Sequence, residues 1–240
     1  MARASFLCLM AGLVMAAAGQ KLQFEVASIK PNNSGDSGSS TTTNDGEVIM
    51  RNNSLRQLIQ NAFDVRSFSL FAPDWLTTVH FDVTAKLPRK ATFAEQRVMM
   101  QALLIERFGL VMHHETKMMQ GYGLVVAKNG PKIQPVTGDG GHSTNSSRGK
   151  IVAEGTTMAQ LADMISRQLR QPVADMTELQ GVFNLTLTYT PEMGEEKAEG
   201  EAGPSIYTAL QEQLGLRLEG RKIPVDTVVV DHVERTPTDN

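Results

Sequence analysis

The sequence is poor in cysteine and in long apolar runs, and each absence removes a class of protein. Cys8 is the only cysteine, which excludes a small domain held by disulfides. Beyond the first 19 residues no apolar run is long enough to span a membrane. Lys and Arg number 23 against 26 Asp and Glu. Because there is no basic stripe, we expect no binding to nucleic acid and no electrostatic attachment to anionic lipid.

The N-terminal residues differ from the rest of the chain. Arg3 is followed by an apolar segment, Phe6 to Ala18, that ends in small residues. This pattern is typical of a secretory signal peptide. We expect residues 1–19 to be cleaved near Ala18 or Gly19 and the mature chain to be exported, to the periplasm or outside the cell. With Cys8 removed, the mature chain depends on an ordinary hydrophobic core and has no membrane span.

Three polar stretches are predicted to be loops, at residues 31–46, 129–149 and 191–203. Between them, helical periodicity and capping residues predict four helices. Alternating segments predict strands. The expected helices lie within 53–63, 92–109, 156–169 and 203–215. The expected strands are 24–30, 47–52, 80–87, 110–117, 122–128, 150–155, 183–189, 216–221 and 226–233.

The order of these elements repeats. Each half reads strand, helix, extended stretch, strand, helix, Gly, strand, turn, strand, and "ERFGLVMHHETK" aligns with "EQLGLRLEGRK". We therefore predict an α+β fold with an internally duplicated unit, each unit a small mixed sheet with two helices on one face. The predicted units are residues 20–130 and 150–240, joined by a linker at 131–149. A unit of this size is marginal alone, so the two should pack together.

Several segments also resemble a known family. "FEVASIKPN", "LRQLIQNAF", "YGLVVAKNGPK" and "MAQLADMISRQLRQPVADMTELQGVFNLTLTYTP" occur here in the order typical of uncharacterised secreted proteins from acidobacteria and other soil bacteria. Those proteins form a domain of unknown function, which also occurs fused to membrane metallopeptidases of the beta-lactam-sensor type. The resemblance implies export and carries no known catalytic residue.

Each half is also similar, in pattern, to the short N-terminal domain of secretins and TonB-dependent transducers. In those domains a capped helix such as "TMAQLADMISRQL" precedes strands, and a second helix such as "YTALQEQLGL" precedes a final hairpin. This similarity implies a periplasmic protein-interaction module.

The segment "HHE" is the one candidate metal site. On a strand, His113 and Glu115 share a face and His114 lies on the other. A zinc ion needs three or four protein ligands, so a further residue would have to come from elsewhere in the chain. The alternative is a polar strand face on which Glu115 pairs with a nearby Lys or Arg, and we favour it. His113 and Glu115 stay as candidate metal ligands, and we predict no cofactor.

The sequence supports no catalytic residue. "GDSG" at 35–38 matches a serine-protease motif, but no histidine precedes it, as the order of residues in those enzymes requires. No GxSxG motif occurs. We therefore interpret 35–38 as part of a loop.

The aromatic stretch "FSLFAPDWL" is the candidate partner surface, with Phe68, Phe71 and Trp75 as its rings. These rings could instead fill the gap between sheet and helix, which we favour, or form an exposed apolar patch. A second candidate is the strand 226–233, which could accept a strand from a partner if it lies at a sheet edge.

The sequence thus predicts an exported, non-enzymatic interaction or sensing module of the cell envelope, with an envelope protein as partner. Two alternatives stay open. One is an extracytoplasmic metal-assisted hydrolase that uses His113 and Glu115 as ligands. The other is a protein that binds a small ligand between the two units.

Overall fold

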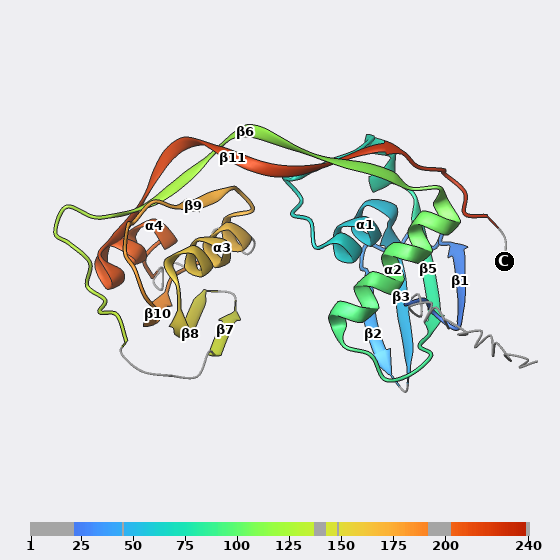
Figure 1. Cartoon of the computed structure of the whole chain (residues 1–240), viewed down its shortest axis with the longest axis horizontal. Helices are drawn as coiled ribbons and strands as arrows, with labels where there is room; N and C mark the ends of the chain where they lie inside the picture. The colour runs from blue at the N-terminus through green and yellow to red at the C-terminus, as the bar shows by residue number, and fades with distance from the viewer. Residues whose placement is uncertain (1–21, 45, 137–142, 148, 192–202, 239–240) are drawn as a thin grey trace, which may run out of the picture.

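The computed structural model describes residues 22–44, 46–136, 143–147, 149–191 and 203–238. These residues form a mixed α+β structure with several sheets and four α-helices, which confirms the predicted class. Two lobes lie side by side, and a long two-stranded ribbon runs across both (Figure 1). Within the described ranges, no helix combines the length and the apolar character needed to cross a bilayer.

The first lobe is built on a four-stranded antiparallel sheet whose strand order is β1-β5-β3-β2. Two helices, which contact each other, pack against it around a core that includes the edge-to-face pair Phe81 and Phe108, with ring centroids 5.1 Å apart. The elements of this lobe are β1 Val26–Pro31, β2 Ser40–Asn44, β3 Glu47–Ser54, α1 Leu55–Phe63, β4 Leu70–Phe71, the 3-10 turn η1 Asp74–Thr77, β5 His80–Lys86 and α2 Phe93–Phe108.

The second lobe has a three-stranded antiparallel sheet in the order β10-β8-β7. Its core contains Met158, Leu161 and Ile165 of α3, Ile206 of α4 and Leu210 of η2. The elements are β7 Ser143–Ser147, β8 Lys150–Thr156, α3 Met158–Leu169, β9 Val173–Asp175, β10 Phe183–Thr188, α4 Ile206–Ala209 and the π-helical turn η2 Leu210–Leu214.

The ribbon consists of β6, Val111–Val126, and β11, Leu216–His232. They pair antiparallel from one end to the other, and β4 and β9 add short parallel strands in the order β4-β11-β6-β9. Each long strand enters both cores. Val228 and Val230 of β11 pack in the first lobe, and Leu124 of β6 packs in the second.

The predicted turns inside these two strands are wrong. The strands expected at 110–117 and 122–128 are one strand, and so are those expected at 216–221 and 226–233. The backbone groups find partners in the other long strand, so neither segment folds back on itself. Pro224, opposite Met118, is tolerated because a two-stranded ribbon leaves outward positions where no N–H is needed.

The helix boundaries follow the predicted caps closely. Ser54, Thr92 and Thr157 each form a capping box with the residue three positions on, and Gly109 ends α2 in a left-handed conformation. The fourth helix differs from the expectation. Ser205 caps it, and after Ala209 it continues as a π-helical turn to Leu214.

Two strands lie where only loops were predicted. β2 falls within the stretch 31–46 and β7 within 129–149, and all five residues of each are exposed. A strand exposed on both faces has no apolar alternation, so only its neighbours β3 and β8 reveal it. Most of the third predicted loop, and the predicted signal peptide, lie outside the described residues.

The two glycines that end α2 and η2 give a matched test of local packing. Gly109 has φ +56° and Gly215 φ +66°. A Cβ on Gly109 would meet nothing closer than 3.8 Å, whereas one on Gly215 would lie 2.8 Å from the backbone N of Lys132. We expect Gly109→Ala to lower the free energy of unfolding by about 1–2 kcal/mol, from the left-handed backbone alone.

For Gly215→Ala we expect the free energy of unfolding to fall by roughly 1–3 kcal/mol more than for Gly109→Ala, because the backbone of residues 130–132 must move. Urea unfolding of the two variants and the wild type measures the difference. Equal losses would contradict this account of the packing at Gly215.

Candidate functional site

The two histidines of β6 contact different carboxylates. His113 Nδ1 lies 2.8 Å from Asp231 Oδ1, and His114 Nδ1 lies 3.2 Å from Asp226 Oδ2. Glu115 forms an ion pair with Lys117 at 2.6 Å, as the favoured alternative predicted. Within the described residues, no group of three or more His, Cys, Asp or Glu side chains could hold a metal ion.

The remaining histidines do not join that cluster. His80 Nδ1 lies 3.3 Å from the Thr78 carbonyl, and His232 Nε2 lies 3.0 Å from Glu234 Oε1. His142 lies outside the described residues. His113 and Glu115 therefore lie two residues apart on β6, and no third described ligand lies beside them.

The three predicted aromatic residues make contacts within the chain. Phe71 is 36% exposed, and Lys117 Nζ lies 3.7 Å from its ring centroid. Trp75 is half-buried against the first core, and the guanidinium of Arg235 lies 4.9 Å from its ring centroid. Phe68 is half-buried. The faces of Phe71 and Trp75 are thus partly occupied by cations of the ribbon and the C-terminal segment.

Two edge strands that the sequence did not predict have exposed residues along their whole length. β2 ends the first sheet and β7 ends the second, and within the described part of the chain they pair only with β3 and β8. Their sequences, STTTN and STNSS, carry no charge and no proline. The two strands lie on the sides of their sheets that face the other lobe (Figure 1).

The pairing of β2 shows which of its backbone groups point outward. Only residues 45 and 46 separate β2 from β3, and the flanking pair is Asn44 and Glu47. In such a short hairpin the flanking pair exchanges hydrogen bonds, and along an antiparallel ladder bonded and non-bonded pairs alternate. Thr41 and Thr43 are then non-bonded positions, so their N–H and C=O groups point toward the free edge.

A small polar network fixes the segment that leads into β2. Asp82 Oδ1 accepts hydrogen bonds from the backbone N–H of Asn52 and the side chain of Asn32, both at 2.8 Å. The buried Asn52, in a left-handed conformation with φ 52°, donates its amide to the carbonyls of Asp36 at 2.7 Å and Gly38 at 2.9 Å. β3 thereby holds the chain just before β2.

The same network shifts the titration of its carboxylate. The bond from the Asn52 backbone, then that from Asn32, holds the pKa of Asp82 below its usual value, and the nearby Arg51 guanidinium contributes in the same direction. In the second lobe, the neutral amide of Asn184 accepts through Oδ1 from the Gly155 N–H at 2.9 Å.

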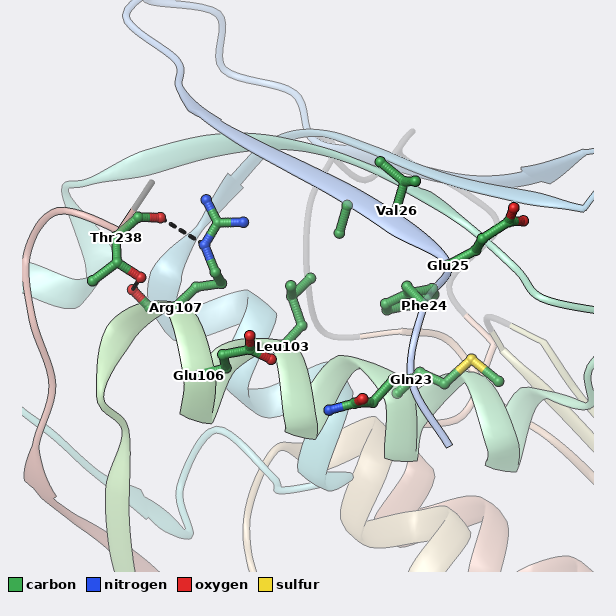
Figure 2. Close-up of a pocket in the computed structure, with 10 residues that line it drawn as sticks. Gln23, Phe24, Glu25, Val26, Leu103, Glu106, Arg107 and Thr238 are labelled. Carbon is green, nitrogen blue, oxygen red and sulfur yellow. Dashed lines mark hydrogen bonds between the residues drawn. The ribbon is translucent and has the colours of Figure 1, made fainter. Parts of the chain in front are cut away.

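Two hollows flank the helices of the first lobe. One, of about 420 Å³, lies between the start of β1 and α2; there Arg107 reaches toward the C-terminal segment and donates to the Thr238 carbonyl at 2.6 Å (Figure 2). The other, of about 580 Å³, adjoins β2. Its volume lies in the range of pockets that bind small ligands. Thr41 and Thr43 line it together with the end of α1 and the start of α2.

Comparison with known proteins identifies a family and nothing further. Residues 56–233 match the model of the family described as Protein of unknown function (DUF3738). No curated protein and no solved structure matched in the corresponding searches.

We expect the Asp82 network to make stability depend on pH. A carboxylate whose pKa is lowered by folding stabilises the fold above its unfolded pKa, and this contribution is lost as the pH falls through the folded value. Asp82→Asn should lower the thermal midpoint by about 2–4 °C near neutral pH. The difference from wild type should shrink as the pH falls below about 4.

Thermal unfolding followed by circular dichroism between about pH 2 and pH 7 measures this effect. Asp36→Asn is the matched control, because Asp36 contributes its backbone carbonyl and not its carboxylate to the network. A midpoint difference for Asp82→Asn that is constant over the whole pH range would contradict the role of its charge.

Proposed function

The chain belongs to the DUF3738 family of proteins of unknown function, and from its geometry we propose that it is an exported, non-enzymatic binding module of the cell envelope. Its partner is an extended segment of another envelope protein. The observation that carries this proposal is β2, an uncharged edge strand whose outward backbone groups have no described strand beside them.

Edge strands of this kind are unusual in a protein without a partner. Natural sheets protect their edges with Lys, Pro, bulges or a covering segment, because a free row of N–H and C=O groups recruits other strands. β2 and β7 carry no Lys and no Pro, and neither ladder shows a register shift. Strand addition to an exposed edge is a general mode of peptide recognition, in which main-chain hydrogen bonds supply affinity.

We also propose that the two lobes are two copies of one unit that exchanged their long strands. β2 and β7 have equal length and pair with the next strand in the same way, and α1 and α3 both have capping boxes and left-handed C-caps, at Asp64 and Arg170. The short strands β4 and β9 each pair parallel with the long strand of the other copy. The exchange joins residues 20–130 and 150–240 through the long strands, and β7 lies within the predicted linker.

One ion pair supports a defined arrangement of the lobes. Arg66, which follows α1, forms an ion pair with Asp163 on α3 of the other lobe, and Arg167 also contacts that carboxylate at 3.2 Å. β2 and β7 lie on facing sides of the two lobes (Figure 1). A single extended segment could therefore meet one edge or both.

Export is supported by the apolar segment Phe6 to Ala18 and by the resemblance to secreted proteins. In the native host, we expect the mature protein to begin at Gly19 or Gln20 and to fractionate with the periplasm or the medium. Mass spectrometry of the purified protein measures the new N-terminus. Leu13→Arg places a charge in the apolar segment and should keep the chain uncleaved in the cytoplasm, whereas an uncleaved cytoplasmic wild type would contradict export.

The edge itself can be tested by photocrosslinking in intact cells, with benzoylphenylalanine in place of the exposed Thr42. We expect a defined protein adduct that is lost in the background Thr41→Pro, because proline removes an outward N–H without touching the bonds to β3. Thr41→Val, which keeps that N–H, should retain the adduct. An adduct that survives Thr41→Pro unchanged would contradict strand addition at β2.

A further inference from the structure

We infer that the hollow beside β2 binds a large apolar side chain of the docked segment, and that this segment is an extended peptide with a carboxylate close to that side chain. This inference rests on the proposed strand addition and names the chemistry that the partner must have. It concerns the first lobe only.

Paired residues on neighbouring strands of the first sheet form rows of side chains, and these rows favour an apolar side chain from an added strand. In one row, Met50 of β3 lies between Thr41 of β2 and Val83 of β5. In the next row, Val48 of β3 lies between Thr43 of β2 and Ala85 of β5. Along each row the residues of β5 and β3 are buried and apolar, and the row ends at a threonine. A strand beside β2 would extend both rows on the face that the helices cover.

The floor of the hollow at the end of these rows is apolar. Val48, Met50, Ala62 and Met100 all line it and are all nearly buried. Two of the four are methionines, whose flexible thioether chains adapt to side chains of different shape. Phe93, at the first turn of α2, also lines the hollow and is 79% exposed. A bound apolar side chain would pack against this exposed ring and bury part of it.

A buried polar atom in the same wall calls for an acceptor. Gln60 lines the hollow, and its Nε2 is inaccessible to water without a hydrogen-bond partner among the described residues. A buried donor without an acceptor costs about 1–3 kcal/mol. An acceptor in the hollow would satisfy this amide only if the Gln60 side chain turned toward it, because Nε2 has no accessible surface.

The charges of the lining complement a carboxylate. Arg66 and Arg97 line the hollow against one acid, Asp64, which pairs with Arg97 at 3.0 Å. Arg66 forms an ion pair with Asp163 of the other lobe, which Arg167 also contacts. Three guanidiniums therefore share two carboxylates, and an acidic residue of the peptide would offset the remaining positive charge.

The hollow described in the second lobe lies elsewhere. Gln168, near the end of α3, donates to Ser146 Oγ of β7 at 3.2 Å, and in the first lobe Thr43 of β2 likewise donates to Gln96 of α2 at 3.3 Å. The hollow of about 370 Å³ at the end of α3 is lined by residues 167–171, 189–191, Ile206 and Tyr207, and by none of β7. This hollow does not reach β7, so we expect the two edges to differ in specificity.

The test selects short peptides displayed on phage against the mature protein and measures the affinity of the enriched peptide by fluorescence anisotropy. We expect enrichment of a large apolar residue with Asp or Glu nearby. Replacing the apolar residue by Ala should weaken binding about tenfold or more, and replacing the acid by its amide about threefold.

Matched variants of the protein locate the site. Ala62→Leu fills the hollow and should weaken binding about tenfold, while Ala94→Leu on the exposed face of α2 should leave it unchanged. If Ala62→Leu also lowers the unfolding midpoint, Phe93→Ala at an exposed position replaces it, with about threefold weaker binding expected. Thr41→Pro should abolish binding, and Thr144→Pro, the corresponding change in β7, should not.

The outcomes separate the two proposals. Loss of binding in Thr41→Pro with no effect of Ala62→Leu, Phe93→Ala or the peptide changes would overturn the pocket and leave strand addition intact. Binding that survives Thr41→Pro would overturn strand addition at β2. Selection that enriches no peptide would overturn both.

Discussion

The antiparallel ladder between β6 and β11 is the interaction on which the rest of the structure depends. It joins residues that lie about a hundred positions apart in the chain, from Val126 opposite Leu216 to Val111 opposite His232. Because each strand places apolar residues in both cores, neither lobe completes its core without the other half of the chain. Separating the lobes would therefore expose buried side chains as well as break the ladder.

This exchange also decides where the accessible edges lie. The ribbon spans both lobes on one side, and β2 and β7 end their sheets on the sides that face each other (Figure 1). The polar network of Asn52 and Asp82 anchors the segment before β2 to β3 and β5, whereas the side chains of β2 itself are exposed.

The predictions that held depend on neighbours in the sequence. Thr92 and Glu95 form a capping box across one helical turn, and the left-handed glycine at position 109 stops the helix, so both could be predicted without tertiary contacts. The predictions that were wrong concern backbone partners far away in the chain. The segment 118–121 was expected to turn, but pairing with residues 221–224 makes it extended. β2, without apolar alternation, is a strand only because β3 lies beside it.

By itself, the sequence determined the α+β class, the N-caps of the first three helices, and the pairing of Glu115 with a neighbouring lysine, because these follow from periodicity and short-range contacts. Only the tertiary structure decided that His113 and His114 go to Asp231 and Asp226, that the long strands are shared between the lobes, and that β2 borders a hollow. Each of these depends on which distant segments pair. That choice is made by the burial of the whole chain, and no local pattern encodes it.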